Sequence, residues 1–225
     1  MTPVRHVIYL HGFTSSPAAT KAERFRRGLQ AHGIGFSAPD FNLPDFATLT
    51  TTRMLDQVRA AIAAVPQGPI ALVGASLGGF VALHAAAADA TGRVDRLVLL
   101  APALDFGGNR LREMGKQGIA EWRRRGRLPV FHYTYNEYRE VGIELYEDAA
   151  QYDALRVPLS RPALVFQGTQ DSIVSPEMVE AWARTQPTVT LRMLDDSHQM
   201  TQSIETIWAE SETFLTGGRS RLPQS

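Results

Sequence analysis

Short apolar runs rich in valine, isoleucine and leucine alternate along the chain with longer segments in which apolar residues recur at helical spacing. A buried strand gives the first pattern, and an amphipathic helix that packs on a sheet gives the second. The runs that predict strands are Val7 to Leu10, Ile34 to Ala38, Ile70 to Val73, Leu97 to Leu100, Ala163 to Phe166 and Val189 to Leu194. Their alternation with helices predicts an α/β fold with a mainly parallel sheet of about six strands.

Helical faces occur in the segments between these strands. The positions that predict them are Ala22, Phe25 and Leu29, then Leu55, Val58, Ile62 and Val65, and finally Ile204, Ile207, Trp208, Ser211 and Phe214. We expect these faces to pack on the sheet. Helix starts are predicted at Ser16-Pro17 and Ser175-Pro176, because each pair places a capping hydroxyl before a proline suited to the first helical position.

The segment from Asp105 to Leu159 breaks this rhythm and mixes arginines with aromatic residues. These residues are Arg110, Arg112, Arg123, Arg124, Arg125, Arg127, Trp122, Phe131, Tyr133, Tyr135, Tyr138 and Tyr146. We expect residues 105–159 to form a cap over the carboxyl ends of the strands, inserted into one domain that spans residues 1–225. The tail at 217–225 has too little apolar content to pack, so it is predicted to be flexible.

Composition narrows the classes of partner. The 225 residues are 44% hydrophobic, and 23 basic residues balance 23 acidic ones, so no overall field attracts nucleic acid or anionic lipid. The absence of cysteine excludes thiol chemistry. The first residues lack the pattern of a signal peptide, and the longest apolar run is too short to span a bilayer. We expect a cytoplasmic protein that acts on a small molecule, and its oligomeric state stays open.

The strongest chemical signal is Gly74-Ala75-Ser76-Leu77-Gly78-Gly79, which joins a predicted strand to an apolar, alanine-rich helix. A G-x-S-x-G motif in a strand, turn and helix is typical of a nucleophile elbow, whose glycines let the strand and helix approach closely. A phosphate-binding loop is the alternative, but the segment lacks the Lys-Ser/Thr ending of a P-loop and the spacing of a dinucleotide site. The pattern therefore predicts Ser76 as a nucleophile.

Two backbone N–H groups are candidate donors to an oxyanion. Leu77 begins the helix after the serine, where the helix dipole favours negative charge. Phe13 lies in His11-Gly12-Phe13-Thr14, a sharp turn directly after the first predicted strand. His11 is expected to orient this turn or to contact substrate, and it is not a candidate base.

A serine hydroxyl is weakly nucleophilic unless a histidine accepts its proton and an acid orients that histidine. Asp171 follows the fifth predicted strand through a glycine turn, and His198 follows the last strand just before the final helix, which gives the chain order Ser, Asp, His. An ordinary turn aspartate is the alternative for Asp171. Asp105 is a rival acid after the fourth strand, whereas Asp195 and Asp196 are too near His198 in sequence.

These motifs resemble those of the α/β-hydrolase superfamily, in particular of small bacterial carboxylesterases. They are His11-Gly12-Phe13, Gly74-Ala75-Ser76-Leu77-Gly78-Gly79, Gly168-Thr169-Gln170-Asp171 and Asp196-Ser197-His198. More loosely, the segments 100–106 and 197–200 are similar to the acyl-glucuronide esterase and depalmitoylase group. The resemblance implies an α/β-hydrolase fold with helices on both faces of the sheet and a cap.

For this chain the resemblance implies Ser76 as nucleophile, Asp171 as acid, His198 as base, Phe13 and Leu77 as oxyanion donors, and no metal or organic cofactor. Two departures from the family pattern indicate a compact variant. Ser197 stands where the family has a glycine before the histidine, and no room remains before Val4 for the two leading antiparallel strands of larger members.

The predicted activity is that of a serine esterase on small molecules, acting through an acyl-enzyme. Thioesterase or acyltransferase chemistry on the same triad is the alternative, and a non-catalytic binding protein with this fold is the alternative from another class. Trp122 and Tyr135 are candidate substrate contacts in the cap. Its arginines and aromatic residues fit an anionic or aromatic acyl group, or the arginines are simply solvated.

Overall fold

The computed structural model describes residues 2–218, apart from the side chains of residues 109–111. Most of the segment predicted to be a flexible tail, residues 219–225, therefore lies outside the described residues. Among the helices of residues 2–218, none combines the length and the apolar run that a bilayer span requires.

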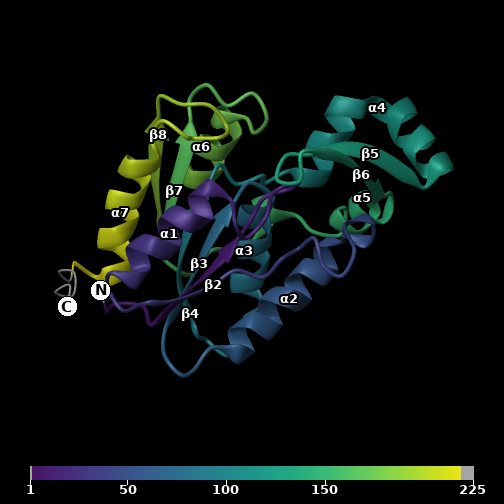
Figure 1. Cartoon of the computed structure of the whole chain (residues 1–225). Helices are drawn as coiled ribbons and strands as arrows, with labels where there is room; N and C mark the ends of the chain where they lie inside the picture. Colours follow the sequence, from purple (N-terminus) through teal and green to yellow (C-terminus); the bar gives the residue numbers. More distant parts are fainter. Residues whose placement is uncertain (1, 219–225) are drawn as a thin grey trace.

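Within residues 2–218, the central sheet has six strands, all parallel, in the spatial order β2-β1-β3-β4-β7-β8 (Figure 1). Their bounds are β1 His6–Leu10, β2 Gly35–Ser37, β3 Ile70–Ala75, β4 Val94–Leu100, β7 Ala163–Gly168 and β8 Val189–Leu194. Each predicted strand is confirmed, with ends that differ by a few residues. A parallel sheet is covered on both faces, which is why the central strands read as continuous apolar runs.

Helices cover both faces of this sheet. On one face lie α1 Thr20–Gln30 and α7 Ile204–Thr216, side by side at the left of Figure 1. On the other lie α2 Thr51–Ala64, α3 Leu77–Ala87 and α6 Pro176–Arg184. Each face has its own apolar core, and successive strand residues alternate between the two cores, as Val7 and Ile8 of β1 do.

One of the two predicted helix starts is confirmed and the other is wrong. Ser175 accepts a hydrogen bond from the Met178 N–H at 3.2 Å, and Pro176 opens α6. Ser16, in contrast, lies four residues before the start of α1 at Thr20, and its hydroxyl accepts from the Ala18 N–H at 3.2 Å. The serine hydroxyl therefore stabilises a tight turn before the helix.

Residues between β4 and β7 form α4 Phe106–Arg125, β5 Arg127–His132, β6 Glu137–Gly142, α5 Glu144–Ala149 and the short helix η2 Ala154–Arg156. In Figure 1 the first four lie together at the upper right, beside the main sheet. β5 and β6 pair antiparallel as a hairpin, and α4 is broken at Gly115, whose φ is 64°. This segment is also the crossover that joins β4 to its neighbour β7.

The segment between β4 and β7 is tied to α2 by polar contacts. The Asp148 carboxylate of α5 accepts from the Thr52 N–H at 2.8 Å and from the Thr52 hydroxyl at 2.6 Å. Trp122 and Leu145 are buried in the same apolar core as α2 and α3. The α4–α5 region therefore packs on the same apolar core as α2 and α3.

We expect stability to fall on acidification because His84 of α3 is held neutral. Its ring packs against Phe80 and Tyr152, with ring centroids 4.8 and 5.3 Å away, and its Nε2 atom is buried without a hydrogen-bond partner among the described residues. Burial lowers the pKa of His84, against an opposing effect from the charge of Asp153. Burial likewise lowers the pKa values of His6 and His132.

Above about pH 6.5, histidine is neutral in both the folded and the unfolded chain and contributes no pH dependence. Below that value the unfolded chain binds more protons than the folded chain, so the free energy of unfolding decreases as the pH decreases. Urea unfolding between about pH 7.5 and 5.5 measures this slope, and His84→Leu should make it shallower. An equal slope in the variant would show that His84 does not contribute to the pH dependence of the free energy of unfolding.

Candidate active site

Ser76 lies at the sharp turn between β3 and α3, with φ 52° and ψ −115°. Such a positive φ is unfavourable for a residue with a side chain and requires support from its surroundings. The Ser76 N–H donates to the Leu100 carbonyl at 2.8 Å, and the Ser76 carbonyl accepts from the N–H groups of Gly79 at 2.9 Å and Ala103 at 3.1 Å. Hydrogen bonds from the end of β4 and the start of α3 therefore hold the strained turn.

The glycines around Ser76 lie where other atoms leave no room for a side chain. A Cβ on Gly74 would overlap the Gly78 carbonyl, and one on Gly78 would overlap the Leu10 carbonyl at the end of β1. A Cβ on Gly79 would lie 2.9 Å from Pro102 Cβ. The close approach of strand and helix that the motif predicts is present.

Gly78→Ala is expected to lower the free energy of unfolding by about 3 kcal/mol or more, because the clashing atoms belong to the backbone and cannot rotate away. Chemical denaturation measures the loss. Gly92→Ala offers a comparison in which added volume meets nothing within 4 Å, although its φ of 66° carries a cost of its own. Equal losses in the two variants would contradict the steric explanation.

His198 and Asp171 meet Ser76 at the carboxyl ends of the strands. His198 Nε2 lies 3.1 Å from Ser76 Oγ, and His198 Nδ1 lies 2.8 Å from Asp171 Oδ2. The Asp171 side chain is 0% exposed and that of His198 15% exposed. With its Nδ1–H donating to the carboxylate, the ring leaves Nε2 as the acceptor for the serine proton.

Four donors hold the Asp171 carboxylate. Oδ1 accepts from the N–H groups of Ile173 at 2.9 Å and Val174 at 2.8 Å, while Oδ2 accepts from Gln167 Nε2 at 2.9 Å as well as from His198. Burial opposes ionisation, but the hydrogen bond and charge of His198 and the two N–H groups outweigh it and keep the pKa of Asp171 below its ordinary value. The group is therefore a fixed anion beside the imidazole.

Gln167 and Asp196 support the site, and neither was identified as such from the sequence. Gln167 is fully buried at the end of β7 and donates to Asp171. The Asp196 carboxylate accepts from the N–H groups of Ser197 at 2.7 Å and Ser203 at 2.9 Å, which fastens the loop that carries His198. A polar residue at the end of an apolar strand run was the only sequence signal for Gln167.

The two predicted oxyanion donors flank Ser76. Leu77 is the first residue of α3, where an N–H has no acceptor within the helix. A Cβ on Gly12 would lie 3.4 Å from Ser76 Cβ, so the turn that carries Phe13 touches the elbow. Both backbone segments thus adjoin the serine side chain.

His11 is 2% exposed, and both its ring nitrogens are used within the protein. Nε2 accepts from the Phe41 N–H at 3.0 Å, and Nδ1 lies 2.9 Å from the Gly12 carbonyl, to which it donates in that tautomer. His11 therefore holds the turn before Phe13, and its predicted contact with substrate stays a prediction.

A buried polar link joins the β5–β6 hairpin to the same turn. His132 at the end of β5 lies with its Nε2 3.0 Å from Asn42 Oδ1, and Asn42 Nδ2 donates to the Ser15 carbonyl at 2.9 Å. The His132 ring also packs against Phe46, which in turn contacts Phe13 with ring centroids 5.6 Å apart. These contacts fix the position of the hairpin relative to the candidate oxyanion turn.

The two predicted cap contacts lie in different surroundings. Trp122 is 3% exposed, and its Nε1–H donates to the Val141 carbonyl at 3.2 Å. Tyr135 is 39% exposed at the hairpin turn and packs on Arg139 and His132. Asp105, the rival acid, pairs with Arg112 while Asp171 occupies the position next to His198 Nδ1.

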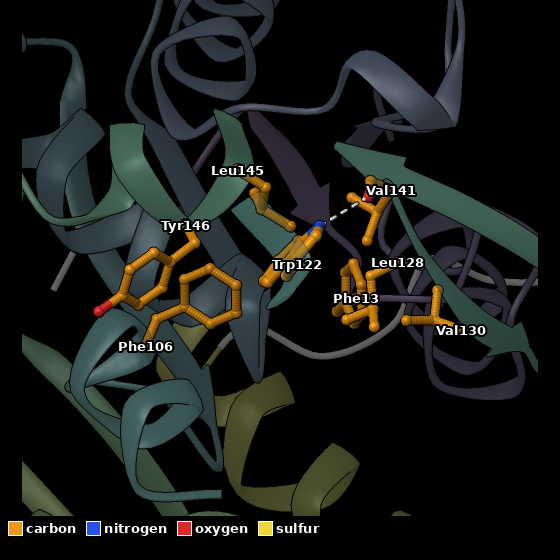
Figure 2. A pocket seen from close by; sticks show the side chains of 8 residues that line it. All are labelled: Phe13, Phe106, Trp122, Leu128, Val130, Val141, Leu145 and Tyr146. Atoms are coloured by element: carbon orange, nitrogen blue, oxygen red, sulfur yellow. Dashed lines mark hydrogen bonds between the residues drawn. The ribbon is translucent and has the colours of Figure 1, made fainter. Parts of the chain in front are cut away.

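An apolar pocket lies between Phe13 and the α4–α5 region (Figure 2). Its walls include Phe13, Phe106, Trp122, Leu128, Val130 and Tyr146. The side chains that line the pocket nearly fill it, and its cavity volume is about 10 Å³, little more than one water molecule occupies. Within residues 2–218, no group of three or more histidine and carboxylate side chains is placed to hold a metal ion.

Comparison with known proteins gives a family and a fold. The model of a family described as "Uncharacterised protein family (UPF0227)" matches residues 6–214. No curated protein matches the chain. Mouse alpha/beta hydrolase domain-containing protein 10 is a structural neighbour with TM-score 0.78 and 22% identity, over 94% of this chain and 90% of that one.

Two other solved structures have the same TM-score. A putative hydrolase from Agrobacterium vitis S4 has TM-score 0.78 and 22% identity, over 96% of this chain and 91% of that one. Est1E from Butyrivibrio proteoclasticus with ferulic acid bound has TM-score 0.78 and 19% identity, over 95% of this chain and 88% of that one. These likenesses confirm the α/β-hydrolase fold that the motifs predicted.

Proposed function

The chain belongs to the UPF0227 family and has the α/β-hydrolase fold, and we propose that it is a serine hydrolase that cleaves carboxylic esters of small molecules. The observation that carries this proposal is the chain of contacts from Ser76 Oγ to His198 Nε2 at 3.1 Å and from His198 Nδ1 to Asp171 Oδ2 at 2.8 Å. Nucleophile, base and orienting acid are the groups that acyl transfer to a serine requires.

In the first half of the reaction Ser76 Oγ attacks the ester carbonyl while His198 Nε2 takes its proton. Asp171 stabilises the imidazolium that forms, because its carboxylate stays ionised and bonded to the Nδ1–H. The tetrahedral intermediate then breaks its bond to the alcohol oxygen, which leaves with the proton from Nε2. The product is an ester of Ser76 with the acyl group.

In the second half His198 Nε2 removes a proton from a water molecule whose oxygen attacks the acyl carbonyl. Collapse of this second intermediate releases the carboxylic acid and returns the proton to Ser76 Oγ. The backbone N–H groups of Phe13 and Leu77 donate to the carbonyl oxygen in both intermediates, when its negative charge is largest. No step requires a metal or an organic cofactor.

We assign the segment 105–159 the role of a cap that shapes the substrate site. The apolar pocket supports this role, because Phe13 of the oxyanion turn and Trp122 of α4 line the same cavity. The His132–Asn42 hydrogen bond supports it too. Asn42 also donates to the Ser15 carbonyl, so it connects the β5–β6 hairpin to the chain just after the turn that carries Phe13. Ferulic acid bound to the structurally similar Est1E is consistent with a carboxylic acid as product.

Labelling with a fluorophosphonate, combined with hydrolysis of p-nitrophenyl acetate and an acetyl thioester, tests the proposed function. We expect covalent label on the peptide that contains Ser76, and loss of ester hydrolysis in proportion to labelling. Heat-unfolded protein is the control, because the serine reacts only in the folded site. Absence of label, label on another residue, or label without turnover of either substrate would contradict a hydrolase at this site.

A further inference from the structure

We propose that Lys21 is a positioning residue for the base, whose ammonium group holds the turn that carries His198 where Nε2 reaches Ser76 Oγ. This inference rests on the proposed ester hydrolysis and adds a residue outside the triad on which that reaction depends.

The turn that carries His198 contains a strained backbone. Met200, two residues after the histidine, has φ 47°, which is unfavourable for a residue with a side chain and requires support. The hydrogen bonds of the Asp196 carboxylate fasten the two sides of the turn, and the Met200 N–H donates to the Ser197 carbonyl at 3.1 Å. None of these bonds involves the carbonyl of Gln199, which belongs to the peptide group just before Met200.

Lys21 holds this remaining carbonyl. Its Nζ donates to the Gln199 carbonyl at 2.7 Å, the length of a charge-assisted hydrogen bond. A peptide group is planar, so a bond that fixes its carbonyl also restricts the dihedral angles on either side, including φ of Met200. The ammonium group therefore supports the strained backbone next to the base.

Lys21 reaches the turn from another part of the site. It lies in the first turn of α1, which begins at Thr20, a few residues after the turn that carries Phe13. α1 packs beside α7, the helix that follows the His198 loop (Figure 1). The hydrogen bond therefore joins the segment that leads out of the candidate oxyanion turn to the loop that carries the base.

Two carboxylates oppose the cost of burying the Lys21 ammonium group. Burial lowers the pKa of Lys21, and the charges of Asp196 and Asp171 counteract this effect. These are the carboxylate that fastens the His198 loop and the one that orients the imidazole. Charge therefore holds the ammonium group in this place together with its hydrogen bond to Gln199.

Lys21→Met tests the role, because it removes the ammonium group and keeps an apolar side chain. We expect kcat for p-nitrophenyl acetate to fall by about ten- to hundredfold, since a small displacement of the imidazole lengthens the 3.1 Å approach to Ser76 Oγ. KM should change by less than about threefold, because the serine and the oxyanion donors keep their places. A merely structural residue would not separate kcat from KM in this way.

Arg93→Met is the matched control. Arg93 lies just before β4, at the opposite end of the sheet from Ser76, and donates to the Ile62 carbonyl at 3.0 Å. This variant also takes a cation from a backbone carbonyl, so it should lower the melting temperature. Its kcat should stay within about twofold of that of the unmodified protein.

The absence of cysteine allows a closer comparison. Lys21→Cys is alkylated in urea and refolded. With 2-bromoethylamine the sulfur bonds to carbon as bromide leaves, which gives a side chain that ends in an ammonium group at the reach of lysine. With 1-bromopropane it gives an uncharged side chain of the same length. The aminoethyl form should recover kcat to within about fivefold of the unmodified protein, whereas the propyl form should stay near Lys21→Met.

The outcomes separate the role of Lys21 from the chemistry. If Lys21→Met loses no more kcat than Arg93→Met, or if the propyl group restores kcat as well as the aminoethyl group does, the role is overturned while ester hydrolysis stands. Should Lys21→Met fail to fold, the two alkylated forms decide, because they differ only in the ammonium group. No hydrolysis of any ester by the unmodified protein would overturn the proposed function, and this inference with it.

Discussion

Ser76→Ala is expected to lower kcat/KM for a simple ester by about four orders of magnitude or more. The methyl group that replaces the hydroxyl cannot attack the carbonyl, and no acyl-enzyme forms. His198 and the backbone donors remain in place, so a small residual rate from binding and oxyanion stabilisation should survive. The fold should be preserved, because the strained turn is held by the backbone hydrogen bonds of Ser76.

Steady-state hydrolysis of p-nitrophenyl acetate, with enzyme concentration raised for the variant, measures this loss. Ser160→Ala is the matched control, since Ser160 is exposed and lies before β7; it should leave kcat/KM unchanged. A Ser76→Ala protein that keeps more than about a tenth of the rate would show that another group is the nucleophile.

Asp171→Asn should lower kcat by about four orders of magnitude, because it forces the wrong tautomer on His198. The carboxylate now accepts on both oxygens: two backbone N–H groups at Oδ1, and Gln167 and His198 at Oδ2. An asparagine must turn its NH₂ group toward one of these pairs of donors. When it faces His198, Nδ1 becomes the acceptor and Nε2 carries the proton, so Ser76 cannot be deprotonated.

The same substitution should also lower the melting temperature. In either orientation the buried NH₂ group of the asparagine faces other N–H donors, and these lose their acceptor. Asp195→Asn is the matched control, because Asp195 is exposed and its carboxylate accepts a hydrogen bond from Gln170 Nε2 at 2.6 Å, away from the triad. The pair of variants is compared by kcat, kcat/KM and thermal unfolding. Activity in Asp171→Asn within about tenfold of the unmodified protein would remove Asp171 from the triad.

The sheet could be predicted from the sequence because the strands of a parallel sheet are buried on both faces. Runs such as Ile70 to Val73 therefore carry a continuous apolar signal. The chemistry-bearing residues were found for a related reason. Ser76, Asp171 and His198 lie within a few residues of the ends of β3, β7 and β8, and parallel strands place their carboxyl ends at one edge of the sheet.

The β5–β6 hairpin could not be predicted in the same way. Its strands are partly exposed and carry Arg, Glu and Tyr, and β5 contains Pro129, so no apolar run marks them. Gln167 and Asp196, which support the site, could not be predicted for another reason. What Gln167 and Asp196 do depends on which loops the fold brings beside them, and the spacing of residues along one chain carries no signal for that.

The segment between β4 and β7 serves the fold and the pocket at once. It lines the apolar pocket, and it is the crossover connection that places β7 beside β4 in the sheet. Changes in substrate choice during evolution or engineering are therefore constrained by folding. The hairpin tip at residues 133–136 can vary in length at little cost, because it is exposed and joins adjacent strands. Shortening near α5, where Asp148 anchors Thr52, would risk the sheet together with the pocket.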